Sequence, residues 1–538
     1  MGIYINSPEQ FFKYRDLKDS KWFVDKTLLI DEVSRQIGTE QKYICITRPR
    51  RFGKTYAANM LAAYYCNVSD KDSHELFDNL NVSKTSDYNK HINKYNVVFI
   101  DFSKVDDECT SYEEYIGNIK AILKDDLRAL FPDVAYREGS NVIEDFNRGF
   151  NELEARFIFV LDEWDAVFHM SFISEDDKKK YLIFLRNLLK DQAYVALSYM
   201  TGILPIAKYS SGSEVNMFME YSMAGGTKFG EYFGFLENEV NDLYQRFVSI
   251  EQRPNFTRTE LEEWYDGYRT IKGDKIYNPR SITAALTDNH IGSYWTSAGP
   301  YDEVSFYVKN NIDEIRNDIA EMISGEKVRS EAKEYAAVSM NLKTRDEILS
   351  AMVVYGFLAY EDGYVKIPNM ELMKQFENML YKESDLGYIN RLAKESQKMI
   401  DATINQNTEV MSKILEYAHD SESPILEYNN EIELSSIVNL VYLSARDQYD
   451  IQREDKGGKG FVDFIFYPRL SGKPGIILEL KVDETAQYAL NQIKDKNYIM
   501  RFKGKIAEKS ACDEIILVGI SYDKKNKKHH CITEKIIL

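Results

Sequence analysis

The first 200 residues alternate short apolar runs with longer segments of helical periodicity. Four runs contain few polar positions, which is typical of strands buried on both faces of a sheet. They span residues 43–47, 97–102, 157–161 and 195–200. Helix-compatible stretches lie between them, at 56–65, 112–130 and 180–189. This alternation predicts an α/β domain whose parallel sheet is covered by helices.

The pattern changes after about residue 238, where it becomes mainly helical up to residue 369. Within this part, residues 346–355 predict a helix, and 357–360 and 364–367 predict two strands joined by a turn. That order is compatible with a winged-helix-like lid. Residues 370–427 are polar and helical in pattern, so we expect a connector there.

A second alternation of helices and strands begins after residue 428. It predicts helices over 434–444 and 485–498, and strands over 461–467, 475–480, 515–521 and 530–533. A chain of 538 residues is also too long for one ordinary core. We therefore predict four segments: 1–237, 238–375, 376–427 and 428–538.

Charge is unevenly distributed along the chain. Residues 451–538 contain 17 Lys and Arg against 12 Asp and Glu, a net of +5, which leaves −23 for the first 450 residues because the whole chain carries −18. This balance argues against a protein that coats nucleic acid along its whole length. It makes the C-terminal region the candidate for contact with nucleic acid.

Cysteine and hydropathy patterns exclude several classes. The five cysteines form no C-x-x-C pair and the seven histidines form no H-E-x-x-H, which argues against a disulfide framework or structural zinc. The N-terminus lacks the apolar region of a signal peptide, and no run of 18 apolar residues exists. We expect a cytoplasmic protein without a membrane segment.

The apolar run at 43–47 leads into a basic loop that ends in Gly53-Lys54-Thr55, just before a predicted helix. Amides at a helix N-terminus, a lysine and a hydroxyl together bind nucleotide phosphates and Mg²⁺. The expected ATP-binding residues are Arg48, Pro49, Arg50, Arg51, Phe52, Gly53, Lys54 and Thr55. Arg48 stands where G-x-x-x-x-G-K-[ST] has its first glycine. A chance Gly-Lys-Thr in a basic loop is the alternative.

Two carboxylates follow the apolar run at 157–161. We expect Asp162 to share the Mg²⁺ shell with Thr55, and Glu163 to orient and polarise the attacking water. Thr201, at the end of the run 195–200, is placed to sense the terminal phosphate. The alternatives are an ordinary solvated loop for the acids and an ordinary polar strand end for Thr201.

Five motifs together carry a resemblance to a known family. In order, they are Phe23-Val24-Asp25-Lys26-Thr27, the loop Thr47–Thr55, Leu161-Asp162-Glu163-Trp164-Asp165, Thr201-Gly202 and Tyr277-Asn278-Pro279-Arg280-Ser281. The chain resembles the bacterial AAA-ATPase-like family, whose members often carry a C-terminal PD-(D/E)XK nuclease domain. The resemblance implies that T-R-P-R-R-F-G-K-[ST] is the family's usual Walker A loop, so Arg48 is a family variant.

The resemblance leaves several roles open. Arg48 is either a phosphate contact or a packing residue. Arg50 and Arg51 either stabilise charge in cis or hold the loop to neighbouring acids. The element Tyr277-Asn278-Pro279 resembles a lid motif, and a plain turn before a helix is its alternative.

A second candidate centre lies in the last segment. Asp463 and the Glu479-x-Lys481 pair lie on predicted neighbouring strands, where carboxylate oxygens suit Mg²⁺ or Mn²⁺ and the lysine can position water. Ordinary alternating strands also produce this pattern. The order of elements, with Glu431 near a helix start and Gln492 on the following helix, matches the PD-(D/E)XK core that the resemblance implies.

These patterns predict an ATP-binding, ATP-hydrolysing protein coupled to a metal-dependent nuclease, with DNA as the polymer that the resemblance favours. The rival is an ATP-switched regulatory or scaffold protein whose nuclease fold is inactive or only binds nucleic acid. A nucleotide-sensing ATPase with a protein partner is a third interpretation, and homo-oligomerisation is left open. The cluster at 524–528 is either a solvated turn or a phosphate contact.

Overall fold

The computed structural model describes residues 2–68, 71–206, 215–223, 228–295, 313–323, 325–331, 344–382, 388–420, 431–457, 460–469, 472–503 and 512–538. The chain divides into two compact units. The first comprises Met1–Pro300 and Arg329–Leu372, and the second comprises Tyr301–Val328 and Met373–Leu538.

The first unit is built on a five-stranded parallel sheet in the order β2-β3-β4-β1-β5. Its strands are β1 (Tyr43–Thr47), β2 (Asn96–Asp101), β3 (Phe157–Asp162), β4 (Val195–Gly202) and β5 (Met219–Tyr221). The four predicted strands are confirmed, and β5 is an addition. Because β4 lies between β1 and β3, its C-terminal end separates the basic loop from the paired acids.

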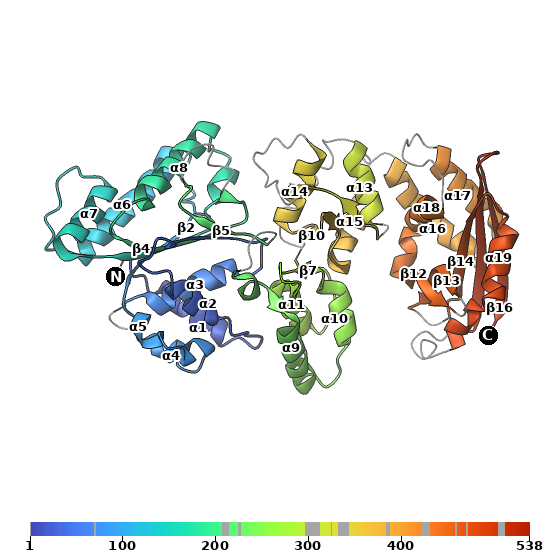
Figure 1. Cartoon of the computed structure of the whole chain (residues 1–538), viewed down its shortest axis with the longest axis horizontal. Coiled ribbons are helices and arrows are strands. Elements are labelled where there is room, and N and C mark those ends of the chain that lie inside the picture. Colours follow the sequence, from blue (N-terminus) through green and yellow to red (C-terminus); the bar gives the residue numbers. More distant parts are fainter. Residues whose placement is uncertain are drawn as a thin grey trace. The chain divides into compact units, whose positions relative to one another are not determined.

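Helices cover both faces of this sheet (Figure 1). On one side lie α1 (Glu9–Lys18), α2 (Leu28–Ser34), α3 (Lys54–Tyr65), α4 (His74–Phe77) and α5 (Tyr88–His91). On the other side lie α6 (Tyr112–Leu130), α7 (Val142–Leu153) and α8 (Glu175–Leu189). Side-chain caps stabilise the starts of α6 and α8. Ser111 accepts from the Glu114 amide, and Ser174 forms a capping box with Asp177.

The remainder of the first unit consists of short helices and strands, three of which form a sheet in the order β6-β8-β7. These elements are β6 (Phe235–Leu236), α9 (Glu237–Ile250), α10 (Arg258–Tyr265), β7 (Tyr268–Arg269), β8 (Lys275–Tyr277) and α11 (Pro279–Asp288). Then α14 (Arg345–Tyr355), β10 (Ala359–Glu361) and β11 (Tyr364–Lys366) supply the predicted helix, strand, turn and strand. Asn278 caps α11 by accepting from the Arg280 and Ser281 amides, and Pro279 occupies the first helical turn.

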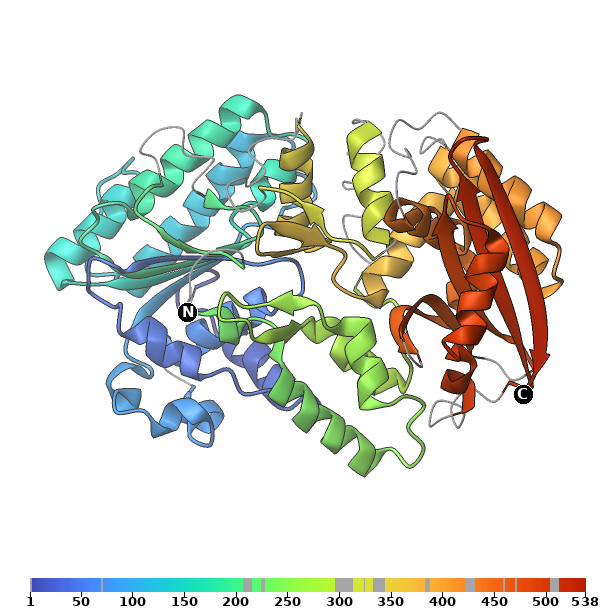
Figure 2. The same cartoon turned by 45° about the vertical axis from the view of Figure 1, so that its right-hand side comes forward.

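The second unit carries a five-stranded mixed sheet in sequential order from β12 to β16. Its strands are β12 (Tyr449–Gly457), β13 (Gly460–Pro468), β14 (Gly475–Val482), β15 (Glu514–Asp523) and β16 (Lys528–Ile537). Only β14 and β15 pair in parallel. The crossover helix between them, α19 (Ala486–Asp495), packs on the sheet through Leu490 and Ile493 (Figure 2).

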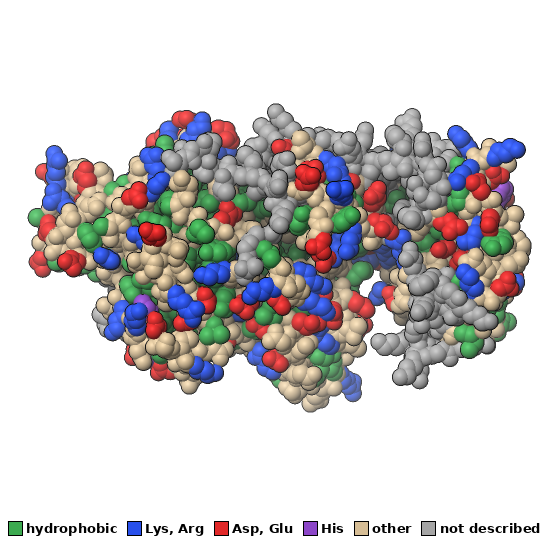
Figure 3. Space-filling model, viewed as in Figure 1, with side chains coloured by type: hydrophobic (Ala, Val, Ile, Leu, Met, Phe, Trp, Pro, Cys, Tyr) green, Lys and Arg blue, Asp and Glu red, His purple; other side chains and the backbone are tan. Residues whose placement is uncertain are grey.

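Helices precede this sheet along the chain: α13 (Asp313–Ile323), α16 (Tyr388–Ile404), α17 (Thr408–Asp420) and α18 (Glu431–Val441). The short strand β9 (Val328–Arg329) and the helix α15 (Met370–Lys382) fall at the boundaries between the units. Within the described ranges, no helix combines the length and apolarity needed to cross a membrane. Charged side chains of both signs are interspersed over the face shown in Figure 3.

Candidate nucleotide and metal sites

The loop after β1 has the geometry of a phosphate-binding turn. Arg51 (φ 68°) and Gly53 (φ 89°) both adopt the left-handed conformation, and α3 begins at the next residue, Lys54. Left-handed residues reverse the chain tightly, so the loop wraps around the first turn of α3. The predicted strand, loop and helix therefore occur in the order that a P-loop requires.

Lys54 is buried and links the two sides of the site. Its Nζ donates to the carbonyl oxygens of Arg48 (3.1 Å) and Pro49 (3.3 Å), and lies 3.7 Å from Glu163 Oε1. The lysine thus bridges the loop after β1 and the acids after β3.

Asp162 ends β3 and is fully buried. Its Oδ1 accepts a hydrogen bond from the Thr201 hydroxyl, while its Oδ2 is buried without a hydrogen-bond partner. Burial raises the pKa of Asp162, and the Thr201 and Thr55 hydroxyls oppose that rise. An unpartnered carboxylate oxygen near a threonine hydroxyl is a donor set that fits Mg²⁺.

Glu163 follows with φ 50°, an uncommon conformation for a residue with a side chain. Its side chain is 27% exposed. Burial raises the pKa of Glu163, and the charge of Lys54 opposes this. A carboxyl group with a raised pKa and partial solvent access has the properties expected of a general base.

Trp164, Asp165 and Gly202 hold the ends of β3 and β4 together. Asp165 Oδ2 accepts from the amides of Ile203 (2.9 Å) and Leu204 (2.7 Å). A Cβ on Gly202 would lie 2.5 Å from the Trp164 ring, so only glycine fits. All three residues lie within the sequence motifs named above, but no local pattern marks this role.

Arg48 is buried in the first unit and turned towards the β5 side of the loop. Its Nη1 donates to the carbonyl oxygens of Thr47 (2.8 Å) and Tyr221 (2.7 Å), and its guanidinium lies 5.2 Å from the Phe233 ring centroid. Burial lowers the pKa of Arg48 to about 10, while Tyr199 opposes the change. These contacts describe a packing role, and a phosphate contact by Arg48 stays a prediction.

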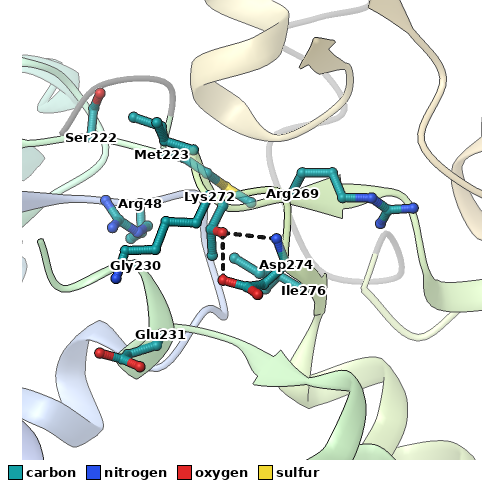
Figure 4. Close-up of a pocket in the computed structure, with 11 residues that line it drawn as sticks. Arg48, Ser222, Met223, Gly230, Glu231, Arg269, Lys272, Asp274 and Ile276 are labelled. Carbon is teal, nitrogen blue, oxygen red and sulfur yellow. Dashed lines mark hydrogen bonds between the residues drawn. The ribbon is translucent and has the colours of Figure 1, made fainter. Parts of the chain in front are cut away.

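A small hollow, with a cavity volume of about 20 Å³, lies beside Arg48. Figure 4 shows Arg48 on one side of it and Arg269 on the other, with Thr270 and Asp274 bonded to each other in its wall. Of the other predicted loop residues, Phe52 is fully buried and Arg50 is half-buried.

The second centre brings the five predicted residues together around β14 in the second unit. Asp463 on β13 accepts from the Leu480 amide (2.7 Å), which fixes it beside β14. Glu479 Oε1 accepts from Gln492 Nε2 on α19. Lys481 Nζ lies 3.6 Å from Glu479 Oε1 and donates to Glu431 Oε1 on α18 (3.1 Å).

Electrostatics set Glu479 apart from its neighbours. Burial, with the charge of Asp463 added, raises the pKa of Glu479 to about 8, and Lys481 opposes the rise. Burial alone would lower the pKa of Lys481, but Glu479 and Glu431 raise it. Glu479 Oε2 is buried and has no hydrogen-bond partner, which fits a cation ligand. Among the described residues, no three Asp, Glu, His or Cys side chains gather as a metal-binding group.

The lysine cluster at 524–528 occupies the turn between β15 and β16. The Lys524 amide donates to Asp483 Oδ1 (3.1 Å), and the Lys525 amide donates to Asp523 Oδ1 (2.9 Å). The predicted hairpin tip is therefore confirmed, and a contact with phosphate stays a prediction.

The fold and the loop geometry define a P-loop nucleoside-triphosphatase domain. It is followed by an α/β domain that carries Asp463 and Glu479 on neighbouring strands. Comparison with protein families identifies both parts. Residues 10–211 match the AAA-ATPase-like family, described as "Predicted AAA-ATPase", and residues 429–531 match the PD-(D/E)XK nuclease superfamily. The predicted architecture is confirmed by these two matches.

Solved structures give more distant similarities. The Walker-type ATPase of Pyrococcus abyssi is 12% identical, with a TM-score of 0.34 over 65% of this chain and 94% of that one. The ORC2 protein of Aeropyrum pernix, in ADPNP and ADP complexes, is 10% identical, with a TM-score of 0.33 over 68% of this chain and 97% of that one. No curated protein matches the chain.

Proposed function

We propose that this chain binds and hydrolyses ATP with Mg²⁺ at the P-loop, and cuts nucleic acid, DNA above all, with Mg²⁺ or Mn²⁺ at the Asp463–Glu479 centre. One observation carries the proposal. Each centre contains a buried carboxylate oxygen without a hydrogen-bond partner, Asp162 Oδ2 or Glu479 Oε2, in the neighbourhood of a buried lysine. Buried polar oxygens of this kind are costly unless a ligand completes them.

At the first centre, Lys54 exchanges its contact with Glu163 for the terminal phosphates of ATP. Thr55 and Asp162 would hold the Mg²⁺ ion, and the Thr201 hydroxyl keeps Asp162 oriented. Glu163, freed from the lysine, accepts the proton of the attacking water.

At the second centre, Asp463 and Glu479 would hold the cation, and Gln492 orients Glu479 through its hydrogen bond. A divalent cation bound there would polarise the scissile phosphate. Lys481, held between Glu431 and Glu479, donates hydrogen bonds that orient the attacking water. The boundaries at residues 237, 375 and 427, a cytoplasmic location and a homo-oligomeric state stay predictions.

The test is a matrix of assays on the full-length protein: single- and double-stranded DNA and RNA, with Mg²⁺ or Mn²⁺, with and without ATP. We expect metal-dependent cleavage that Asp463→Asn and Lys481→Met each reduce at least about 100-fold. Glu484→Gln, which changes an exposed carboxylate after β14, is the matched control and should cut normally. A protein that binds ATP but cuts none of these polymers would support the rival, an ATP-switched regulatory or scaffold protein.

A further inference from the structure

The P-loop is held from outside by residues more than 200 positions downstream, within the same unit. Trp295 Nε1 donates to the carbonyl oxygen of Arg50 (3.1 Å). Arg51 Nη1 donates to the carbonyl oxygen of Tyr294 (3.4 Å). The Phe52 ring meets Tyr268 edge to face, with centroids 5.2 Å apart. None of these contacts has a part in the chemistry proposed above.

A single buried carboxylate fixes the segment that makes two of these contacts. Glu371 Oε1 accepts from the amides of Tyr294 (2.5 Å) and Trp295 (2.6 Å), and its Oε2 accepts from the Ser281 hydroxyl (2.7 Å). Glu371 is only 2% exposed, so these three donors replace its water. Since Tyr294 and Trp295 lie outside any helix or strand, Glu371 supplies the order that secondary structure would otherwise give.

The loop is also packed tightly at Pro49. Gly356, the C-cap of α14, has φ 86°, and a Cβ there would lie 2.7 Å from Pro49 Cβ. Tyr268 donates its hydroxyl hydrogen to the Gly356 carbonyl oxygen (2.5 Å). A shift of the loop backbone would therefore disturb these packed residues.

We propose that Glu371 and Trp295 are positioning residues for nucleotide binding. Glu371 orders Tyr294 and Trp295, and the Trp295 indole in turn holds the Arg50 carbonyl, so that the P-loop keeps the shape that accepts phosphates. This inference rests on the proposed ATP binding at Lys54. Because a preordered loop loses less conformational entropy on binding, the two residues act on affinity rather than on the bond-breaking step.

The test measures ATP affinity and tryptophan fluorescence in the full-length protein. Trp295→Phe removes the indole donor and keeps an aromatic ring, while Glu371→Gln removes the charge that accepts the two amides. Each variant should bind ATP about tenfold more weakly, since one or two hydrogen bonds that order the loop are lost. The turnover number at saturating ATP should stay within about twofold of the parent.

Trp264→Phe is the matched control, because Trp264 lies on α10 and packs against the hydrophobic cluster formed by α9, α10 and α11. We expect Trp264→Phe to bind ATP like the parent and to keep the fluorescence change on adding ATP. The change should be smaller in Trp295→Phe, where Trp164, which follows Glu163, still responds. Thermal unfolding of every variant separates a change in affinity from a loss of fold.

The outcomes separate the two proposals. If the parent binds no ATP, the proposed function fails and this inference fails with it. If the parent binds ATP and folded Trp295→Phe binds it equally tightly, with the fluorescence change intact, only the positioning role is overturned. If Glu371→Gln does not fold, the ATP affinity of Trp295→Phe alone tests the positioning role.

Discussion

Lys54 Nζ lies 3.7 Å from Glu163 Oε1. The lysine proposed to contact the phosphates therefore forms an ion pair with the carboxylate proposed to activate water. Lys54 begins α3, after the loop that follows β1, and Glu163 follows β3; β4 lies between these two strands. In this arrangement each holds the other, and ATP has to compete with Glu163 for the lysine.

Lys54→Ala should weaken ATP binding by roughly 10- to 100-fold, which corresponds to the loss of one charge-assisted contact with phosphate. Titration with a fluorescent ATP analogue measures the effect. Lys90→Ala, which removes an exposed lysine of α5, should bind like the parent. Equal affinity in Lys54→Ala and the parent would remove the P-loop assignment.

Glu163→Gln should lower ATP turnover by about 100- to 1,000-fold, because the general base is lost. Its ATP affinity should equal or exceed that of the parent, because Lys54 no longer has an anionic competitor. Phosphate release and nucleotide binding are measured side by side, with Glu40→Gln, an exposed position, as the control. Unchanged turnover would exclude Glu163 as the base.

Gly202→Ala should destabilise the first unit by about 1–3 kcal/mol. The new methyl group would lie 2.5 Å from the fully buried Trp164 ring and 2.7 Å from Asp165 Oδ1, so the end of β4 has to move. Turnover should fall as well, since Thr201 is the preceding residue and bonds to Asp162. Urea unfolding measures the stability.

Gly117→Ala is the control for that substitution, because a Cβ at Gly117 meets nothing within 4 Å and the position is helical. It should be neutral or stabilising by up to about 1 kcal/mol. If both variants unfold at the same urea concentration, the close approach of Gly202 to Trp164 has no energetic importance.

The features that the sequence predicted are those encoded locally. The strand β1, the loop and Lys54 are contiguous, and the apolar run of β3 ends directly in Asp162 and Glu163. Glu479 and Lys481 are two positions apart on one strand, so alternation alone puts them on the same face. Patterns of this range need no knowledge of the tertiary fold.

The missed features depend on distant contacts or on weak patterns. The strand β5 has only three residues, and β12 carries Asp450, Arg453 and Asp455, which hide its strand character. The bond between Trp295 and Arg50 joins positions 245 residues apart, and Glu371 acts on a segment 76 residues before it. No local sequence pattern marks these pairs, because nothing around either residue of a pair distinguishes it from other residues of its type.

Metal binding at the second centre should weaken as pH falls below about 8. Burial and Asp463 raise the pKa of Glu479 to about 8, so at lower pH a cation has to displace a proton from this carboxyl group. The same pKa shift makes the stability of the metal-free protein depend on pH. The folded state holds the proton more tightly than the unfolded chain, so stability falls as pH rises from about 4.5 through 8. A bound cation should offset that loss.

Calorimetric titration with Mn²⁺ at pH 6.5 and 8.5 checks this prediction. We expect affinity to be at least about tenfold higher at pH 8.5, because one proton is released on binding and each pH unit below the pKa costs up to about a factor of ten. Glu479→Gln and Asp463→Asn should lose the binding at both pH values, whereas Glu484→Gln, at an exposed position, should keep the parent's response. Equal Mn²⁺ affinity at the two pH values would mean that Glu479 is already ionised at pH 6.5, and the buried carboxylate would then have a partner other than a cation.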